Sequence, residues 1–339
     1  MKIIFYILLL FLSACSDGTD VTAFTPAQIN GSTIKIASFN IAELGNEKMD
    51  KDFEAIAKMI NRFDLIALQE VQDTGGKEAV MNIYTALNKI SGNSYALPLV
   101  IPNSGKGFPG IEGYAFIYRD PVALDNRVSP VYDFRSDDHD IYGRIPGFAH
   151  FKAGTFDFVV ATVHLQWGNI DRRAKEVMDI KQWLIEYANR SVAEERDLII
   201  VGDFNRYGDG KPKGNLTDAV IDSHNAPFDS LVDFNELAQT YRLISLEFLP
   251  TLYTRFASLD AQSTTIATEN ALYDQIMISA GSFREYTATP SLFGEDIGVV
   301  AFDMEAPWTE KKHEEIKAAI SDHRPIWARF RIDLGDDDG

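Results

Sequence analysis

The sequence predicts a single α/β domain in which β-sheets pack face to face and helices cover their outer faces. Two observations lead to this fold class. Short runs of β-branched and aliphatic residues, typical of buried strands, recur along the chain, and amphipathic helical segments lie between them. No stretch within residues 33–335 has the composition of a linker, and no internal repeat is visible. We therefore expect one layered domain over residues 33–335.

The first part of this domain alternates strands and helices. Residues 33–40 alternate apolar and polar side chains, which is typical of a strand, whereas the apolar residues of 50–61 recur at helical spacing. A second buried strand is expected over residues 64–70, and an amphipathic helix over 77–90. Four glycines and three prolines predict a loop over residues 98–113.

The remaining elements are identified by the same criteria. We expect further strands over residues 114–118, 156–164, 197–201, 272–278 and 326–332. The helix with the most regular apolar face is expected over residues 171–190, and a short helix should close the acidic segment 296–319. Residues 133–140 read as a polar loop and 336–338 as a solvated tail, while the mixed signals of 206–260 predict no element.

The charge of the chain limits what it can bind. With 50 acidic and 32 basic residues, the formal net charge is −18. Such a chain carries no large basic surface for nucleic acid, so a polyanionic substrate must be held locally, by a metal ion or by a few arginines and lysines. The charge argues against a tight or processive DNA binder, but a hydrolase that engages a few phosphates remains compatible with it.

The N-terminus has the features of a leader. Lys2 precedes an apolar run over residues 3–12 that is too short to span a bilayer. The next residues, 12–15, resemble a bacterial lipoprotein cleavage box, which implies a signal peptide over 1–14 and acylation of Cys15, the only cysteine. Residues 15–32 would then be the acylated cysteine and a flexible tether. We expect an exported bacterial lipoprotein of the cell envelope, on the periplasmic face or the cell surface; the alternative is a signal peptide with an incidental cysteine.

The central candidate for a functional site is the end of the strand that leads into residues 202–205. Gly202 breaks the apolar run, and Asp203 and Asn205 follow it one residue apart. In extended backbone these two side chains point to the same face, so a carboxylate and an amide project together beyond the sheet. Ligands of α/β sheets bind beyond the carboxyl ends of strands. The alternative is a plain turn, which both residue types favour.

Asp203 and Asn205 share this placement at strand ends or in adjacent turns with seven further polar residues: Asn40, Glu70, Glu112, His164, Asp274, Asp322 and His323. One or two carboxylates commonly hold Mg²⁺, and Glu70 is the first candidate, with Asn40 and Asp322 beside it. The two histidines and two further carboxylates allow two Asp/Glu–His pairs. A carboxylate in such a pair orients the ring and favours its charged form, as general acid–base chemistry requires.

Six short segments carry a family resemblance. They are IASFNI at 36–41, LQEV at 68–71, TVH at 162–164, GDFN at 202–205, YDQI at 273–276 and SDHRP at 321–325. In this order they resemble the motifs of the endonuclease/exonuclease/phosphatase superfamily, over roughly residues 33–333. The deoxyribonuclease I branch is the most similar, because Gly45, Lys48-Met49, Glu112 and Thr264-Thr265 match its pattern. The resemblance implies two packed β-sheets flanked by helices, a four-layer α/β sandwich.

The resemblance also implies the metal ligands. Glu70 would hold a catalytic Mg²⁺, with Asn40 at the metal or at the phosphate. Asp203 and Asp322 would bind the metal or place the attacking water. Mn²⁺ would suit the same ligands, and a structural Ca²⁺ stays an open alternative.

The same resemblance implies the acid–base and phosphate-binding residues. His164 oriented by Glu112, and His323 oriented by Asp274, would share proton transfer: one activates water and the other protonates the leaving oxygen. The phosphate-binding residues would be Asn205 and Arg144.

Three departures concern the grip on duplex DNA. Gln72 stands where the deoxyribonuclease places an arginine in the minor groove, Gly110 replaces a tyrosine that packs on a sugar, and Ser263 stands where a calcium-binding carboxylate is expected. The disulfides of that branch are absent. The phosphodiester chemistry is therefore expected, but binding to duplex DNA is not carried over.

Three functions follow from these observations. The leading one is a membrane-tethered, Mg²⁺-dependent phosphodiesterase, a deoxyribonuclease I-like endonuclease that takes DNA as its substrate and acts as a monomer without a protein partner. The alternative keeps the fold but acts on a phospholipid head group or a small phosphoester. The third is a non-catalytic surface binding protein on this scaffold. Metal-dependent nicking of a plasmid separates the first from the other two.

Overall fold

The computed structural model of the chain describes residues 32–102, 112–125, 143–167, 169–188, 195–205, 241–244, 273–279, 281–286 and 297–335. Outside these residues lie the predicted leader, almost all of the predicted tether, the loop 133–140, the tail 336–338, and most of 206–260. Gly110, Ser263 and Thr264-Thr265 lie outside them too. Within the described part of the chain, no helix has both the length and the apolar character needed to cross a membrane.

Two six-stranded sheets form the centre of the molecule. The first sheet has the order β11 (Ile297–Val299), β12 (Ile326–Arg331), β1 (Thr33–Leu44), β2 (Leu65–Gln72), β4 (Glu112–Tyr118) and β3 (Leu99–Ile101). The second sheet has the order β5 (Val122–Leu124), β6 (Gly147–Ala153), β7 (Phe156–His164), β8 (Leu198–Asp203), β10 (Asp274–Ser279) and β9 (Tyr241–Ile244). The pairs β1–β2 and β7–β8 are parallel, and the other pairs are antiparallel.

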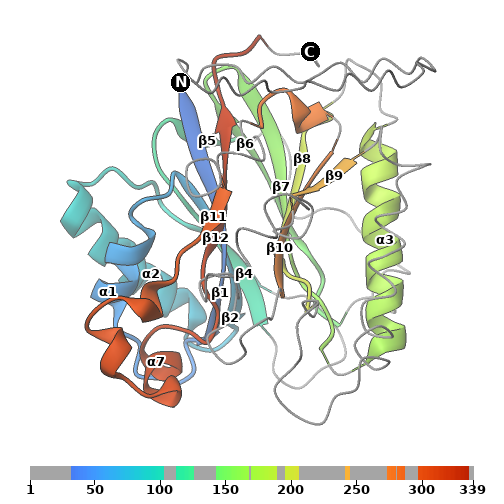
Figure 1. Cartoon of the computed structure of the whole chain (residues 1–339). Coiled ribbons are helices and arrows are strands. Elements are labelled where there is room, and N and C mark those ends of the chain that lie inside the picture. The colour runs from blue at the N-terminus through green and yellow to red at the C-terminus, as the bar shows by residue number, and fades with distance from the viewer. Residues whose placement is uncertain are drawn as a thin grey trace, which may run out of the picture.

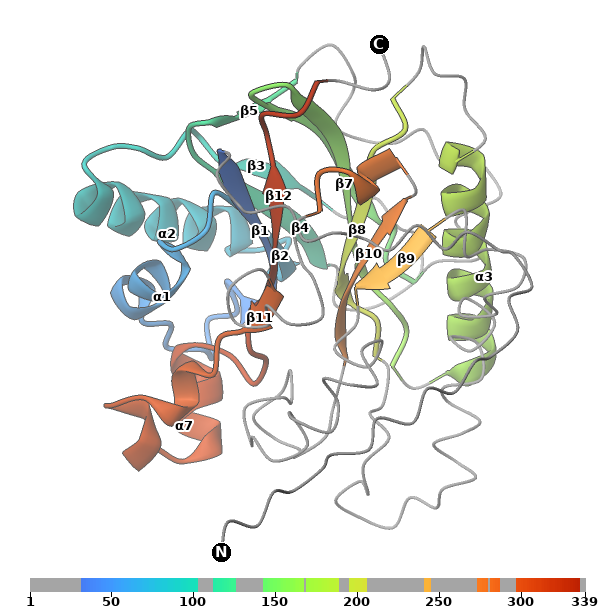
Figure 2. The same ribbon diagram turned by 45° about the horizontal axis from the view of Figure 1, so that its top comes forward.

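Helices cover the outer face of each sheet (Figures 1 and 2). On the first sheet these are α1 (Phe53–Ile60), α2 (Gly76–Ser91) and α7 (His313–Ala319); the helix on the second sheet is α3 (Ile170–Ala188). Short 3₁₀ turns, η3 (Gly281–Phe283), η4 (Phe302–Met304) and η5 (Trp308–Glu310), lie in the connections. The order helix, sheet, sheet, helix confirms the predicted four-layer α/β sandwich.

The ends of the helices follow from local sequence. At the start of α1 the Asp52 side chain accepts a hydrogen bond from the Ala55 N–H, which satisfies one of the free donors of the first turn. The helix α2 ends at Gly92, whose φ of 71° is a left-handed conformation that glycine adopts without a steric penalty.

Three apolar layers hold the four structural layers together. The central one lies between the sheets, where Phe151 meets Phe116 edge-on at 5.5 Å between ring centroids and stacks on Phe158 at 6.0 Å. A second cluster packs α1, α2 and α7 on the first sheet, and a third packs α3 on the second sheet. Because both faces of the central strands are buried, their ends are held rigidly relative to one another.

Some short strands were not predicted from the sequence. The strand β3 lies inside the predicted loop 98–113, and β11 lies inside the predicted acidic loop of 296–319, so both assignments were wrong at these residues. The strands β5, β6 and β9 had no prediction at all. Four of these five have three or four residues, too few to show a period of two, and each forms because a longer neighbour offers it backbone partners.

Local irregularities redirect the chain where the strands end. The β1–β2 register shifts between Asn40 and Leu44, and the β2–β4 register shifts between Leu68 and Val71. Such bulges bend a strand and turn a side chain to a new direction. Gly202 has a φ of 145°, and a Cβ there would lie 2.0 Å from the Val163 carbonyl oxygen. Only glycine fits at this position, directly before the strand's last residue.

Candidate active site

The ten residues singled out in the sequence come from strands or turns at one rim of the two sheets. Strand ends supply Glu112 at the start of β4, His164 at the end of β7, Asp203 at the end of β8 and Asp274 at the start of β10. Bulged or turn segments supply the rest, namely Asn40, Glu70, Arg144, Asn205, Asp322 and His323. The two sheets therefore contribute opposite walls of a single site.

The first histidine pair joins the two sheets. The Nδ1 atom of buried His164 lies 2.7 Å from Glu112 Oε1, and the Arg144 guanidinium contacts the same carboxylate oxygen. Burial lowers the pKa of His164, as does Arg144, but Glu112 and Asp203 outweigh both and leave the pKa raised. For Glu112, burial raises the pKa, yet His164 and Arg144 lower it below its ordinary value.

The second pair is built in the same way from different elements. His323 Nδ1 lies 2.8 Å from Asp274 Oδ2, and its backbone N–H donates to Ser321 Oγ at 3.0 Å. The Ser321 hydroxyl in turn donates to the Asn40 carbonyl at 2.7 Å, which ties this turn to β1. Burial lowers the pKa of His323, but Asp274 and Asp203 raise it to about 10. At neutral pH this imidazole therefore carries a proton.

Asp203 lies between the two histidines. Its Oδ2 atom is 3.6 Å from His164 Nε2 and 3.7 Å from His323 Nε2, slightly beyond hydrogen-bond distance. The same oxygen accepts a hydrogen bond from Asn40 Nδ2 at 3.0 Å, and Oδ1 accepts one from the Asn205 N–H at 2.8 Å. Both Nε2 atoms thus face one carboxylate, and an oxygen of water or substrate placed beside that carboxylate can exchange a proton with either ring.

Glu70 and Asp203 share one amide donor. Asn40 Nδ2 donates to Glu70 Oε1 at 2.9 Å as well as to Asp203, while the Ala42 N–H donates to Asn40 Oδ1 at 3.1 Å. The Ala42 contact fixes the amide, so Asn40 presents N–H groups here and its oxygen is already engaged. Of the two roles predicted for Asn40, the geometry favours an N–H donor to anionic oxygens over a metal ligand.

The donor set fits a divalent cation. Glu70 is half-buried, and its Oε2 accepts the Glu43 N–H at 2.7 Å, leaving carboxylate lone pairs for an ion. Two carboxylates that approach one amide repel each other, and hard oxygen ligands of this kind suit Mg²⁺ or Mn²⁺. Glu70, Glu112 and His164 also present ligand atoms within 4.8 Å of one another. Because the charge of Arg144 already neutralises Glu112, we favour a cation position between Glu70 and Asp203 over one beside Glu112.

Asp322 is held by a cation of its own chain. Its Oδ2 lies 2.7 Å from Lys317 Nζ. Burial raises the pKa of Asp322, but His323 and Lys317 outweigh burial and leave this pKa below its ordinary value. Nearby, the buried Lys51 ammonium donates to the carbonyls of Lys317 and Ile320 at the end of α7. Burial lowers the pKa of Lys51 to about 8. A metal at Asp322 would have to share the carboxylate with Lys317.

Asn205 is engaged differently from its predicted role. Its Nδ2 donates to the Leu165 carbonyl at 2.8 Å, and its φ of 54° is left-handed. The amide therefore fastens the segment after His164, and a phosphate oxygen would have to be bound by its remaining N–H.

Several residues of the site were missed in the sequence. Gln69 Nε2 donates to Thr162 Oγ1 at 2.8 Å and to Ser38 Oγ at 3.1 Å, a buried link between the two sheets beneath the site. The sequence signal that could have identified these three residues is that each is a polar residue within an otherwise apolar strand. For Lys51 and Lys317 no sequence signal distinguished them from surface lysines.

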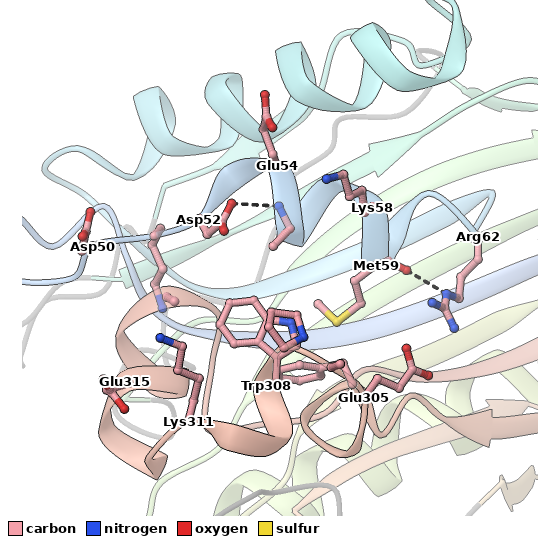
Figure 3. A pocket seen from close by; sticks show the side chains of 16 residues that line it. Asp50, Asp52, Glu54, Lys58, Met59, Arg62, Glu305, Trp308, Lys311 and Glu315 are labelled. Carbon is pink, nitrogen blue, oxygen red and sulfur yellow. Dashed lines mark hydrogen bonds between the residues drawn. The ribbon is translucent and has the colours of Figure 1, made fainter.

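A pocket of about 800 Å³ lies elsewhere, between α1 and the segment from η4 to α7 (Figure 3). Met59, Phe302 and Trp308 give it apolar surface, and charged side chains of both signs surround them. None of the ten predicted site residues lines it, although Lys51, which lies near Asp322, does. Trp308 therefore lies outside the candidate active site. We assign no chemistry to this pocket.

One prediction follows from the two pairs. Replacing Asp274 by asparagine should lower the pKa of His323 from about 10 toward the ordinary histidine value of about 6.5. The matched variant Glu112→Gln should lower the pKa of His164 only. NMR titration of the imidazole protons in metal-free protein measures both, and a change in the wrong histidine would contradict the pairing.

The same shift has a defined effect on stability. Because the folded-state pKa of His323 exceeds the unfolded value, its contribution to the free energy of unfolding is complete below about pH 6.5 and is lost as pH rises through the folded-state pKa. Asp274→Asn should remove this pH dependence in denaturant unfolding followed between neutral and alkaline pH.

Acid–base pairs and clustered carboxylates at one rim of a four-layer α/β sandwich define a hydrolytic phosphoesterase of the kind that depends on divalent metal. The model of the Endonuclease/Exonuclease/phosphatase family matches residues 37–323, which include all ten site residues. The chain belongs to this family, as the six sequence motifs predicted.

Curated relatives are distant. Deoxyribonuclease-1 of Bos taurus is 24% identical over 310 residues, covering 87% of this chain and 92% of the relative. A deoxyribonuclease of Thioalkalivibrio sp. (strain K90mix) is 25% identical over 308 residues, covering 88% and 71%. Deoxyribonuclease gamma of Homo sapiens is 27% identical over 177 residues, and that match spans only 51% of this chain and 56% of the relative.

Solved structures share the fold at low identity. ANGEL2, a 2′,3′-cyclic phosphatase, superposes with a TM-score of 0.52 at 16% identity, covering 90% of this chain and 97% of that one. D. rerio TDP2 complexed with a single-strand DNA product gives a TM-score of 0.50 at 14% identity, covering 88% and 99%. At these identities the likeness establishes the fold.

Proposed function

We propose that the protein is a Mg²⁺-dependent phosphodiesterase that cleaves DNA internally, as a deoxyribonuclease I-like endonuclease. The observation that carries this proposal is Asp203 placed between His164 Nε2 and His323 Nε2, each imidazole being backed by its own carboxylate. Two opposed proton carriers are what in-line hydrolysis of a phosphodiester requires, one for the attacking water and one for the leaving oxygen. The names of the curated relatives support DNA as the substrate.

We assign the two proton-transfer roles from the charges around each ring. Asp274, Asp203 and Asp322 all favour the charged form of His323, so it holds a proton at neutral pH and donates it from Nε2 to the leaving oxygen. Arg144 disfavours the charged form of His164 and shares its Glu112 partner. The pKa of His164 is raised as well, but of the two rings it is the one with a cation beside it that opposes its charge. We therefore assign His164 as the base that accepts a proton at Nε2 from water, while Glu112 keeps the ring oriented.

The residues that would hold the metal are Glu70 and Asp203. Asp322 would be a further ligand only if it shared its carboxylate with Lys317. A divalent ion there supplies electrostatic stabilisation of the charge that develops on the phosphate oxygens. Around that position Asn40 presents N–H groups to anionic oxygens, and Arg144 provides a fixed positive charge beside Glu112.

The test uses supercoiled plasmid and the protein from Ser16 onward, without the proposed signal peptide. We expect Mg²⁺-dependent conversion of supercoiled to nicked and then linear DNA, abolished by EDTA. An intact plasmid, with single-stranded DNA also left intact, would overturn the endonuclease proposal. The control is Glu112→Gln, which should nick far more slowly if the activity belongs to this site and not to a contaminant.

A second candidate is a phosphodiesterase or phosphatase acting on a phospholipid head group or a small phosphoester. The half-buried Gln72 at the end of β2 favours it, since the deoxyribonuclease pattern has an arginine there for the minor groove. Hydrolysis of bis-p-nitrophenyl phosphate without plasmid nicking would support this candidate.

We also propose that the mature protein is tethered to the cell envelope through a lipid on Cys15 and acts there as a monomer. The support is the leader itself, with Lys2, the apolar run 3–12 and the cleavage box 12–15. Incorporation of labelled fatty acid into the wild type, but not into a Cys15→Ser variant, is the measurement that decides it.

A further inference from the structure

Trp167 is an exposed aromatic residue close to the catalytic rim. It follows His164 by three residues, and 59% of its surface is exposed. Three residues of chain span at most about 11 Å between Cα atoms. The backbone of Leu165, two residues before Trp167, is hydrogen-bonded to Asp203 and to Asn205, so this segment starts at the site itself. A single exposed apolar residue is common on protein surfaces and assigns nothing by itself. What distinguishes Trp167 is the way its backbone is supported.

A wholly buried arginine holds the backbone at this position. Arg173, on the first half of α3, has none of its surface exposed. Its Nη1 atom donates to the Gln166 carbonyl at 3.3 Å and to the Trp167 carbonyl at 3.2 Å. Withdrawing a guanidinium from water is costly unless hydrogen bonds and charges compensate for the lost solvation. These two carbonyls are part of that compensation, so the loop and the buried cation stabilise each other.

A buried carboxylate also holds this loop, through a backbone N–H. Glu176, one helical turn after Arg173, is also wholly buried. One carboxylate oxygen accepts the Gln166 N–H at 2.8 Å, and the other accepts the Gly143 N–H at 3.3 Å. Gly143 directly precedes Arg144, which contacts Glu112. One carboxylate therefore fixes both the segment that leads from His164 to Trp167 and the segment of Arg144.

An aromatic side chain on a fixed backbone suits stacking on a base. Base–aromatic stacking contributes about 1–3 kcal/mol per base, and a preorganised platform loses little conformational freedom on binding. Inside a duplex both faces of a base are covered by its neighbours, whereas an unpaired base offers a free face. A chain with a formal charge of −18 gains little from general attraction to phosphates, so stacking would add to the few local contacts that hold the phosphate.

We infer that Trp167 is a stacking platform for an unpaired nucleobase next to the scissile linkage, and that the enzyme prefers single-stranded or unpaired nucleic acid. The inference rests on the proposed function and specifies its substrate class. Arg173 and Glu176 are positioning residues for this platform, and they do not touch the reacting atoms.

The experiment is a double-mutant cycle in which one change is made in the protein, at Trp167, and the other in the substrate, by removal of a base. The substrate is a single-stranded oligonucleotide with one cleavable phosphodiester and methylphosphonate linkages elsewhere. Two further versions lack the base on the 5′ side or on the 3′ side of that linkage. We expect Trp167→Ala to lower kcat/KM on the complete substrate by about 5- to 150-fold, as 1–3 kcal/mol implies. On one of the two abasic substrates, wild type and variant should be equal. Trp167→Phe should keep most of the activity.

Two controls separate stacking from structural damage. The kcat for bis-p-nitrophenyl phosphate should not change in Trp167→Ala, whereas its KM can rise because its aromatic rings also stack on an indole. Leu97→Ala removes another exposed apolar side chain, 64% exposed, near the Tyr118 end of β4 and far from Glu112; it should behave as wild type on every substrate. Equal losses on the complete and both abasic substrates would overturn the inference while leaving the nuclease proposal standing. A wild type that hydrolyses the small diester but no oligonucleotide would overturn both.

Discussion

His164→Ala and His323→Ala should each lower kcat for plasmid or oligonucleotide cleavage by a factor of about 10² to 10⁴, with a smaller change in KM. The reason is geometric: each Nε2 faces Asp203 Oδ2, at 3.6 Å and 3.7 Å, and each Nδ1 is fixed by a buried carboxylate. Removal of either ring deletes one of two proton transfers that the other ring cannot supply. The measurement is steady-state kinetics at saturating Mg²⁺.

The double variant sharpens this prediction. If both rings act in one chemical step, His164→Ala/His323→Ala should lose much less than the product of the two single effects, because residues that act as a unit are not additive. His313→Ala, at the start of α7, is the matched control and should retain kcat. Near-normal kcat in either single variant would exclude the two-histidine mechanism.

Glu70→Ala should lower kcat by about 10²- to 10³-fold and weaken the binding of Mg²⁺ or Mn²⁺. Glu70 is the half-buried carboxylate that meets Asp203 at the amide of Asn40, and its removal leaves one carboxylate where two converged. Calorimetric titration of the metal-free protein measures the binding, and the metal dependence of cleavage measures the activity.

The control for this variant is Glu47→Ala, since Glu47 is an exposed glutamate on the segment that follows β1. It should leave metal binding and kcat unchanged. Unchanged metal affinity in Glu70→Ala would exclude both candidate positions of the ion, because Glu70 is a ligand in each: beside Asp203, and in the group with Glu112 and His164.

The long strands and helices could be predicted from the sequence because their signals are local. In β7 and β8 the run of buried aliphatic residues is long enough to exclude a loop, and Gly202 marks the end of β8 with a φ that other residues rarely adopt. The strands β3, β5, β9 and β11 gave no such signal. They exist because a neighbouring strand offers hydrogen-bond partners, which is a property of the assembled sheet.

The residue types of the site could also be predicted from the sequence, since eight of the ten lie within the six motifs, and Glu112 and Arg144 follow from the resemblance to the deoxyribonuclease I branch. Their contacts were not. Asn40 and Asp203 meet across 163 positions, and the orientation of the Asn40 amide depends on the Ala42 N–H and on a bulge between β1 and β2. Likewise, nothing near Asp322 in the sequence indicated that Lys317 would occupy its carboxylate.

By itself, then, the sequence determined the fold class, the family and the kinds of side chain at the rim, because apolar periodicity and motif order are properties of short segments. The tertiary structure alone decided that one aspartate lies between two histidines, that Asn40 presents N–H groups to carboxylates, and that α3 fixes the backbone of Trp167. These facts depend on how two sheets and a helix pack together, and such packing joins residues that no local pattern connects.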